Sequence, residues 1–407
     1  MTQEIVAQKL ATLASFDLHA RTRLVFGVGT VDRVGTLARE LGGRRVLLVT
    51  DPGIIKAGHA GRVQDHLLKA GLDVSVYDRV RENPTTRDID QCLEMAREFR
   101  ADLLVGLGGG SSMDTAKGTN FLLTNGGEMK DYWGVGKATK PMLPLIAIPT
   151  TAGTGSECQC AALIADEATH QKMACLDPKA AARVAILDPA LTLSQPPGVT
   201  ACTGIDAIAH AVETAVTTKR NPLSLMYSHE AFQLCVGALP RVLEDPQDLD
   251  ARGRMLLGAA FAGTAIENSM LGIAHSAANP LTARFNIVHG QAVGMLLPAV
   301  VRFNSVLPEV AEAYAHLASA PEIACVSEGH EAAVDALIAR LETLLNLAGM
   351  PRSLADCGVQ LTDIPSLAAE AKRQWTANFN PRPATVEDFE SIYGSTFRRR
   401  GDGDLGQ

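Results

Sequence analysis

Residues 103–118 read LLVGLGGGSSMDTAKG and join a short apolar run, a glycine-rich turn and a helical pattern. A short apolar run that ends in glycine is typical of a parallel strand buried on both faces. The glycines allow the backbone to approach a phosphate group, and the helix that follows offers free N–H groups. Ser111 stands where the dinucleotide fingerprint GxGxxG has its third glycine. The segment therefore predicts either an anion site or a plain strand-to-helix turn.

Similar apolar runs lie on both sides of this segment and alternate with helical patterns. Alternation of this kind predicts a parallel sheet with helices on both faces. After Pro189 the strand signal stops and the remaining patterns are helical. We therefore expect a Rossmann-like α/β domain over residues 1–190 and an all-helical domain over residues 191–407. The expected strands are 46–50, 74–77, 103–107, 145–148 and 184–187, and the expected helices of the second half include 205–217, 222–239, 251–268, 291–303, 309–317 and 332–348.

The overall composition limits the possible partners. The chain has 407 residues and a net charge of −8, and an acidic surface disfavours nucleic acids and anionic membranes. With 4% aromatic residues, platforms for base stacking are not expected either. No apolar stretch of membrane-spanning length occurs, and the first 20 residues do not resemble a signal peptide. The eight cysteines form no CxxC pair, which favours reduced thiols in a cytoplasmic protein.

Polar residues follow several of the expected strands at their carboxyl ends. Asp51 comes directly after strand 46–50, where a carboxylate can accept hydrogen bonds from the ribose of a dinucleotide. Asn83 follows the next strand region, and the loop 149–157 brings several hydroxyl groups and glycines to the end of strand 145–148. Ligands of open parallel sheets bind at this edge. Together with the glycine turn, these loops predict a dinucleotide site.

The helical half contains a candidate metal site. Asp206 and His210 are four residues apart and lie on one face of an apolar helix, where unpartnered polar groups cost several kcal/mol. His275 and His289 also lie in small, apolar surroundings. One carboxylate with three imidazoles is a ligand set suited to Fe²⁺ or Zn²⁺. Spacing alone leaves open whether the four residues meet, and a hydrogen-bonded core histidine is the commoner outcome for an isolated pair.

The motifs taken together resemble those of the iron-dependent (group III) alcohol dehydrogenases, in a subgroup similar to lactaldehyde reductase. The resemblance extends over nearly the whole chain. It rests on GGGSSMDTAK at 108–117, IPTTAGTGSE at 148–157, TGIDAIAHAVE at 203–213, GIAH at 272–275 with HG at 289–290, and NPRPATVEDF at 380–389. It implies a dinucleotide-binding α/β domain and a helical metal-binding domain of the dehydroquinate synthase-like fold, with the metal in the cleft between them.

The resemblance also assigns roles to particular residues. The implied metal ligands are Asp206, His210, His275 and His289. The implied cofactor residues are Gly109, Gly110, Ser111 and Asp114 in the pyrophosphate loop, Thr150, Thr151 and Thr154 in the hydroxyl-rich loop, Lys172 near the nicotinamide ribose, and Asp51 as the residue that selects NAD over NADP. The implied cofactors are NAD and Fe²⁺, with Zn²⁺ or another divalent metal as alternatives.

The chain departs from the family pattern near the expected reaction centre. Where the family usually has a second histidine, four residues after the first metal histidine of this region, this chain has Asn279. A bulky aromatic residue of the substrate pocket is replaced by Ile266, with Glu267 beside it. We count Asn279 with the four ligands as catalytic candidates. Since an amide does not titrate near neutral pH, the usual proton path does not carry over.

The resemblance implies hydride transfer between NAD(H) and a small primary alcohol or aldehyde. Two alternatives keep the same fold: a transhydrogenase that retains NAD and exchanges hydride between a hydroxyacid and an oxoacid, and a metal- and NAD-dependent lyase similar to dehydroquinate synthase. A non-catalytic NAD-binding scaffold is a third. A homodimer is also implied, and residues 22–29 have the alternating pattern of an edge strand that could pair across a two-fold axis.

Overall fold

The computed structural model describes residues 16–17, 21–169, 171–319, 323–325 and 329–397. By their contacts, the residues from 21 to 196 and from 247 to 263 group into an α/β unit, and those from 197 to 246 and from 264 onward into a helical unit. Segment 247–263, which we expected in the helical domain, thus groups with the α/β unit. A close approach of two backbones helps to explain this, because a Cβ on Gly155 would lie 2.6 Å from the Cα of Gly263.

The α/β unit is built on a six-stranded sheet in which every pair of neighbouring strands is parallel. The strand order is β1 (Arg23–Phe26), β9 (Val184–Leu187), β6 (Leu145–Pro149), β4 (Leu103–Gly108), β2 (Arg45–Val49) and β3 (Asp73–Tyr77). The predicted parallel sheet is confirmed. The chain moves from β2 outward to β3 and then back to the other side of β2, so β2 and β4 flank the point where the strand order reverses.

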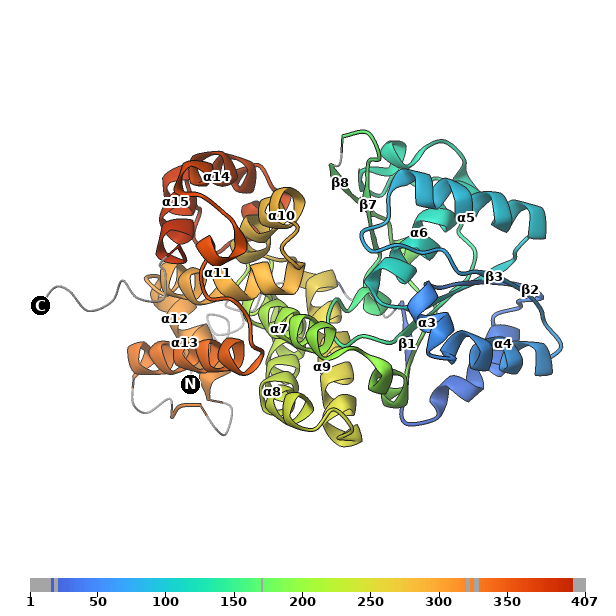
Figure 1. Cartoon of the computed structure of the whole chain (residues 1–407), viewed down its shortest axis with the longest axis horizontal. Helices are drawn as coiled ribbons and strands as arrows, with labels where there is room; N and C mark the ends of the chain where they lie inside the picture. Colours follow the sequence, from blue (N-terminus) through green and yellow to red (C-terminus); the bar gives the residue numbers. More distant parts are fainter. Residues whose placement is uncertain (1–15, 18–20, 170, 320–322, 326–328, 398–407) are drawn as a thin grey trace, which may run out of the picture. The chain divides into compact units, whose positions relative to one another are not determined.

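The sheet is buried on both faces, which explains its uninterrupted apolar strands. Val46 and Leu48 of β2 pack in one cluster with residues of α2 (Val34–Glu40) and α4 (His59–Lys69). Leu47 and Val49 point to the other face and pack with residues of α5 (Thr86–Phe99) and α6 (Gly110–Asn125). Figure 1 shows these two helix layers on opposite sides of the strands. Both alternating sets of side chains are therefore buried, as expected for a parallel sheet covered by helices on both faces.

A second, three-stranded sheet of the α/β unit was not predicted. Its order is β5 (Gly134–Val135), β8 (Lys172–Leu176) and β7 (Ala161–Ala165), with β7 and β8 antiparallel. At the start of the turn that joins β7 to β8, Asp166 accepts hydrogen bonds from the backbone N–H groups of Ala168 and Thr169. The unit also contains α3 (Pro52–Lys56) and the short 3-10 helices η1 (Thr30–Arg33), η2 (Met129–Tyr132), η3 (Ser156–Cys158), η4 (Pro178–Ala180) and η5 (Pro189–Ser194).

In its described residues the helical unit contains helices and no strand, as predicted. Its main helices are α7 (Pro197–Thr214), α8 (Pro222–Glu244), the end of α9 (Leu249–Ser269), α10 (Ile273–Phe285), α11 (His289–Asn304), α12 (Pro308–Ala318), α13 (His330–Leu347), α14 (Ile364–Lys372) and α15 (Val386–Ser395). The short helices η7 (Ala355–Cys357), η8 (Leu361–Asp363) and η9 (Trp375–Phe379) complete it. In the described part of the chain no single helix is long and apolar enough to cross a membrane. Helices α9 and α10 together reach the required length and apolar composition, but the chain bends by 107° between them.

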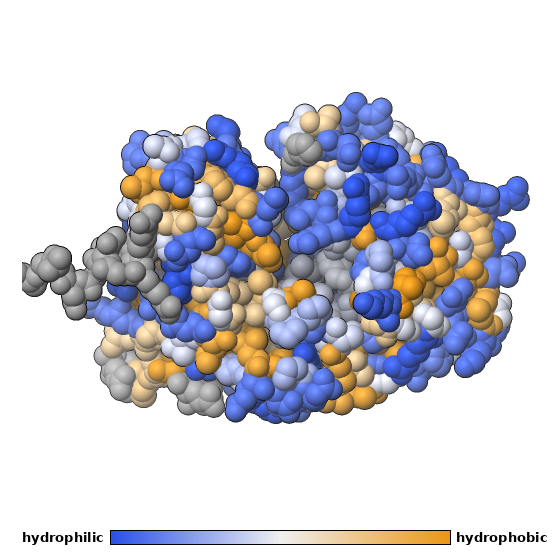
Figure 2. Space-filling view, viewed as in Figure 1, coloured by the Kyte–Doolittle hydropathy of each residue, from blue (hydrophilic) through white to orange (hydrophobic). Residues whose placement is uncertain are grey.

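The surface shown in Figure 2 mixes hydrophilic and hydrophobic residues in both units, and hydrophilic residues prevail over α5. The strong amphipathic pattern of α5 agrees with this view. Its buried residues include Ile89, Cys92, Leu93 and Ala96, which recur at helical spacing. The helix begins with a capping box in which Asp88 accepts a hydrogen bond from the backbone N–H of Thr85.

Candidate functional site

Helix α7 carries the first two candidate metal ligands. Asp206 and His210 lie one turn apart in a helix whose neighbouring residues are almost all buried. The Nε2 atom of His210 is 3.6 Å from Oδ1 of Asp206. Both side chains have an exposed fraction of 6%. A carboxylate and an imidazole are therefore held together in an apolar part of the helical unit.

Two further helices bring histidines to the same carboxylate oxygen. His275 lies in the first turn of α10, and its Nε2 atom is 3.5 Å from Oδ1 of Asp206. His289 is the first residue of α11, and its Nε2 atom is 4.0 Å from the same oxygen. Gly290 permits this approach, because a Cβ there would overlap the carbonyl oxygen of Cys202 on α7. The structure thus brings all four predicted residues together.

The ligand atoms fit a divalent cation. Those of Asp206, His210 and His275 all lie within 4.8 Å of one another. Among the described residues, neither Oδ1 of Asp206 nor Nε2 of His275 has a hydrogen-bond partner, although both are buried. Buried polar atoms are normally satisfied, and one cation bound between them would satisfy both. His289 is the accessible member of the set, with 34% of its side chain exposed.

The electrostatics of the four residues agree with this interpretation. Burial by itself would raise the pKa of Asp206, but the neighbouring imidazoles outweigh it and hold the pKa well below its usual range. Burial opposes protonation of His275, yet the carboxylates of Asp206 and Glu213 raise its pKa to about 9. The two carboxylates therefore favour the protonated form of His275, with which a divalent cation would compete.

Glu213 is a functional candidate that the sequence analysis missed. It is buried at the end of α7, and its Oε2 atom lies 2.6 Å from Nδ1 of His275. The same carboxylate accepts hydrogen bonds from the backbone N–H groups of Gly272 and Ala274, at 3.1 and 2.7 Å. It therefore caps α10 and also orients the ring of His275 toward Asp206. Its position seven residues after Asp206, on the same helical face, was the signal that could have revealed it.

The candidate cofactor residues of the α/β unit gather at the carboxyl edge of the sheet. Helix α6 begins at Gly110, with Gly109 as its N-cap residue. Gly108 has a φ of 141°, and a Cβ there would lie 2.5 Å from Oγ of Ser112 and 3.0 Å from Oδ2 of Asp51. The turn therefore requires glycine at this position. Asp51 and the glycine turn meet where the strand order reverses, the usual place for a dinucleotide.

Asp51 also caps helix α3. Its Oδ1 atom accepts a hydrogen bond from the backbone N–H of Ile54 at 3.0 Å and so caps α3. Its Oδ2 atom is 3.5 Å from the hydroxyl oxygen of Ser112. The carboxylate is thus fixed in orientation beside the glycine turn.

Asn83, Ser111 and Lys172 form a second group at this edge. Asn83 has a φ of 52°, and its backbone N–H donates to Oγ of Ser111 at 3.3 Å. The ammonium group of Lys172 donates to Oδ1 of Asn83 at 3.4 Å. Three predicted cofactor residues from distant parts of the sequence are therefore neighbours.

The hydroxyl-rich loop lies directly against the glycine turn. The backbone N–H of Thr150 donates to the carbonyl oxygen of Gly108 at 3.0 Å. A Cβ on Gly110 would lie 3.0 Å from Cγ2 of Thr154, and one on Gly109 would lie 3.5 Å from Cγ2 of Thr151. The four predicted cofactor loops thus converge within the α/β unit.

The residues that depart from the family pattern lie in the helical unit. Asn279 is one turn after His275 on α10, and its Nδ2 atom donates to Oε1 of Gln374 at 3.1 Å. It is partly exposed, whereas the residues from Gly272 to Ala278 are buried. Ile266 is also buried. The amide of Asn279 is therefore held in place on the face of α10 that carries a candidate ligand.

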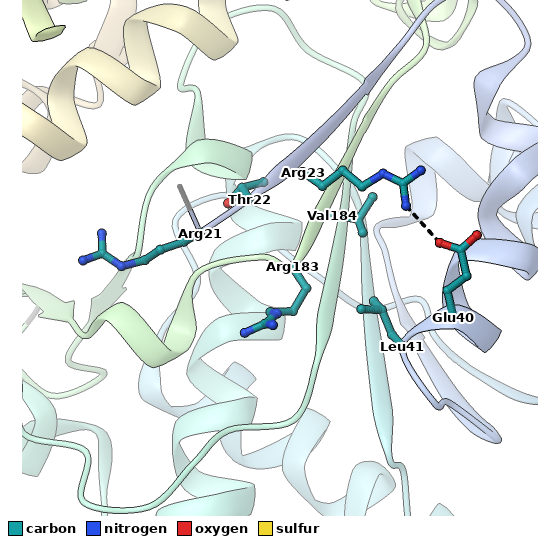
Figure 3. A pocket seen from close by; sticks show the side chains of 7 residues that line it. All are labelled: Arg21, Thr22, Arg23, Glu40, Leu41, Arg183 and Val184. Atoms are coloured by element: carbon teal, nitrogen blue, oxygen red, sulfur yellow. Dashed lines mark hydrogen bonds and ion pairs between the residues drawn. The ribbon is translucent and has the colours of Figure 1, made fainter. Parts of the chain in front are cut away.

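A pocket of about 440 Å³ lies at the opposite, amino-terminal end of strands β1 and β9. Its lining comprises Arg21, Thr22, Arg23, Glu40, Leu41, Arg183 and Val184 (Figure 3). Arg23 forms an ion pair with Glu40 at 2.9 Å, and Figure 3 shows the three guanidinium groups pointing in different directions. The pocket is remote from the carboxyl edge of the sheet and takes no part in the candidate cofactor site.

Comparison with known proteins identifies the family of the chain. Residues 21–189 match the model of the iron-containing alcohol dehydrogenases, and residues 200–397 match that of the C-terminal part of the same family. The chain is 34% identical over 368 residues to the NAD-dependent methanol dehydrogenase of Bacillus methanolicus, covering 90% of this chain and 96% of that protein. It is also 34% identical over 370 residues to the lactaldehyde reductase of Escherichia coli, with coverage of 90% and 96%.

Solved structures show the same fold. A 1,3-propanediol oxidoreductase superimposes with a TM-score of 0.91 at 31% identity, covering 94% of this chain and all of that one. An alcohol dehydrogenase from Oenococcus oeni superimposes with a TM-score of 0.90 at 31% identity and the same coverage. From its matching sequence over both units and its fold, we conclude that this chain belongs to the iron-containing alcohol dehydrogenase family.

Proposed function

We propose that the chain is a metal-dependent, NAD-linked alcohol dehydrogenase or aldehyde reductase acting on a small primary alcohol or its aldehyde. One observation carries the proposal: a buried carboxylate oxygen of Asp206 is surrounded by three imidazole Nε2 atoms at 3.5, 3.6 and 4.0 Å. This set is suited to Fe²⁺, and Zn²⁺ accepts the same ligands. The names of the relatives, which include a methanol dehydrogenase and a lactaldehyde reductase, support small alcohols and aldehydes as substrates.

The cofactor half of the proposal rests on the α/β unit. The N-terminus of α6 would face the pyrophosphate of NAD, since helix N-termini bind anions. Asp51 would accept hydrogen bonds from the adenosine ribose, and Lys172 would lie at the nicotinamide ribose. The residues proposed to line the site are Asp51, Asn83, Gly109, Gly110, Ser111, Asp114, Thr150, Thr151, Thr154 and Lys172.

The roles of the chain's own residues follow from their chemistry. When bound, the metal ion supplies a Lewis acid and NAD supplies the hydride acceptor. Asp206 and three neutral imidazoles would hold a divalent ion with a remaining net charge of +1. Glu213 would keep the Nδ1–H of His275 engaged, so that Nε2 is the atom directed toward Asp206. Asn279 cannot change its charge near neutral pH, so we assign it the positioning of a water molecule or of the nicotinamide amide rather than proton transfer.

The alternative lyase activity is not favoured by the structure. A lyase acting on a phosphorylated acid needs basic side chains at its site, and Arg284 is the basic residue between His275 and His289. The guanidinium group of Arg284 donates to Oγ of Ser366 at 2.6 Å and lies 3.4 and 3.7 Å from the carboxylates of Glu370 and Asp363. Its charge is already compensated by two acidic residues. The named relatives are dehydrogenases and reductases, which also disfavours the lyase.

We propose that the enzyme is a homodimer that pairs through β1. This strand hydrogen-bonds to β9 on one side, and among the described residues no strand pairs with its other edge. Leu24, Phe26 and Val28 are exposed by 37%, 46% and 61% along this segment. Unpaired edges with exposed apolar residues are suited to association. Light scattering at micromolar concentration should give twice the chain mass, and a monomeric mass would reject the dimer.

A cytoplasmic location is proposed from the state of the cysteines. The eight cysteines form no CxxC pair in the sequence, and five of them are buried in the structure. Thiols of this kind are typical of reducing compartments. Fractionation of the source cells should recover the protein with the cytoplasmic enzymes, and recovery from an oxidising compartment would contradict the proposal.

The test of the proposed function is a substrate panel. Protein reconstituted with Fe²⁺ without oxygen should reduce added NAD⁺ in the presence of at least one small primary alcohol, measured by NADH absorbance. Turnover should require added NAD⁺ after dialysis, whereas a transhydrogenase with retained NAD would need only a second carbonyl substrate. Absence of NADH formation across C1 to C4 alcohols and diols, with full metal occupancy, would reject the proposal.

A further inference from the structure

A fully buried lysine lies beneath the proposed cofactor site. Lys117 is on α6, two turns after the glycine turn, and its exposed fraction is 0%. A buried ammonium group is unfavourable unless its protons are all hydrogen-bonded. The Nζ atom donates to the carbonyl oxygen of Ser156 at 2.7 Å, to Oγ of Ser156 at 2.9 Å and to the carbonyl oxygen of Ala161 at 2.9 Å. Two of the three acceptors belong to Ser156 in the hydroxyl-rich loop, and the third belongs to Ala161, the first residue of β7.

The hydroxyl group of Ser156 also contacts a second residue of α6. Its hydroxyl group donates to Oδ1 of Asp114 at 3.0 Å, and Asp114 lies one turn before Lys117 on α6. Ser156 is therefore held by two charged side chains, with Lys117 donating to it and Asp114 accepting from it. The positive charge of Lys117 also opposes the effect of burial, which raises the pKa values of Asp114 and Glu157.

Ser156 lies near the end of the hydroxyl-rich loop, which faces the glycine turn. The backbone N–H of Ser156 donates to Oγ1 of Thr154 at 3.3 Å. Thr154 lies close to Gly110. Gly155 packs closely against Gly263 of α9, and a side chain on either glycine would clash with the other. The loop is thus fixed on two sides, and the position of Ser156 determines where Thr151 and Thr154 lie relative to the N-terminus of α6.

We propose that Lys117 is a positioning residue for the cofactor, which holds the 150–156 loop against the pyrophosphate turn through Ser156 without touching the cofactor. The inference rests on the proposed NAD site and adds to it a residue that positions one of its loops. Because the lysine has no exposed surface and donates to three protein oxygens, its effect on NAD must pass through the loop. The adenosine end, near Asp51, is not held by this contact.

The test measures binding to the whole protein and needs no turnover. NAD⁺ and AMP are titrated by calorimetry against the unmodified protein, Lys117→Met and Ser156→Ala. Thr119→Ala serves as the control, because Thr119 is fully buried on the same helix and makes no hydrogen bond to residues 150–161 among the described contacts. We expect NAD⁺ affinity to fall at least 10-fold in Lys117→Met and about 3- to 10-fold in Ser156→Ala. AMP affinity should stay within 2-fold in all variants, and Thr119→Ala should match the unmodified protein.

The outcomes separate this inference from the proposed function. If the unmodified protein does not bind NAD⁺, the proposed function fails and the inference fails with it. If the unmodified protein binds NAD⁺ and both variants bind it within 2-fold, only the positioning role is overturned. Equal losses for NAD⁺ and AMP would indicate general damage to the fold and would also overturn it. Ser156→Ala removes only the hydroxyl group that Lys117 and Asp114 hold, so unchanged NAD⁺ affinity in this variant overturns the route through that hydroxyl even if Lys117→Met does not fold.

Discussion

The carboxylate of Glu213 lies 2.6 Å from Nδ1 of His275 and leaves Nε2 of that ring directed toward Asp206. The contact joins α7 to α10, two of the three helices that carry the proposed metal ligands. A histidine ligand held in this way keeps one tautomer and one ring orientation, which raises its affinity for a metal. Glu213 therefore extends the proposed site beyond its four ligands.

Replacement of Glu213 should weaken metal binding without removing a ligand. Glu213→Gln is expected to lower Zn²⁺ affinity about 10-fold and Glu213→Ala about 100-fold, because partners of metal-bound histidines contribute by such factors. Competition with a chromophoric chelator measures both values. Glu230→Gln, an exposed position on α8, is the control. Unchanged affinity in Glu213→Ala would show that the orientation of His275 does not depend on this carboxylate.

The cofactor preference should depend on Asp51. We expect the unmodified protein to bind NAD⁺ at least 10-fold more tightly than NADP⁺, because a carboxylate repels a 2′-phosphate at close range. In Asp51→Ser the side chain can still cap α3, which Asp51 does through Ile54, but the charge is gone. The ratio of the two dissociation constants should therefore fall in this variant. Equal binding of NAD⁺ and NADP⁺ by the unmodified protein would contradict the assignment.

Glu157 should make the stability of the protein depend on pH. Burial raises its pKa from 4.5 to about 7, so the folded state favours the protonated form. The stabilising contribution is full below pH 4.5 and is lost as the pH rises through 7. Glu157→Gln stays uncharged, so its free energy of unfolding relative to the unmodified protein should rise by about 3 kcal/mol between pH 4.5 and 8. Urea unfolding at several pH values measures this difference, with Glu98→Gln, an exposed position on α5, as the control. A difference that does not vary with pH would refute the prediction.

Asn279→Ala should lower kcat only modestly, by less than about 10-fold, because an amide that does not titrate can position a group but cannot relay a proton. Asn279→His should be tolerated and should add a titration between pH 6 and 7.5 to the pH–rate profile. Both variants remove the amide that donates to Gln374, and their comparison shows what the titrating ring adds. Complete loss of turnover in Asn279→Ala, with metal and NAD still bound, would make Asn279 essential to the chemistry.

The parallel sheet and the helical second half could be predicted because apolar runs that alternate with helical patterns are typical of a parallel sheet. The strand ending in Gly108 contributes apolar residues to a buried core on each face of the sheet, and its uninterrupted apolar run is typical of a strand buried in this way. The β7 and β8 strands were missed because the turn between them, at Asp166, has no glycine or proline to mark the strand ends. Segment 247–263 was assigned to the helical domain because a helical pattern does not reveal which core it packs against.

The candidate site was predictable in part for similar reasons. The pair Asp206 and His210 follows from helical spacing, whereas the approach of His275 and His289 depends on how α10 and α11 pack on α7. The spacing of Glu213 from Asp206 places it on the same helical face but does not reveal its partners, which are the backbone N–H groups of Gly272 and Ala274 and the ring of His275. The role of Lys117 depends on a contact with a loop 39 residues away.

The most direct test of the account is the metal content of Asp206→Ala beside that of the unmodified protein. After reconstitution with Fe²⁺ and removal of excess metal, the unmodified chain should hold about one ion per chain and Asp206→Ala should hold almost none. Asp335→Ala, which removes an exposed carboxylate of the same unit, should keep the full amount. NAD⁺ affinity should change by less than about 3-fold in both variants, because the proposed cofactor residues belong to the other unit. Full metal occupancy in Asp206→Ala would contradict the assignment of the metal site and, with it, the proposed chemistry.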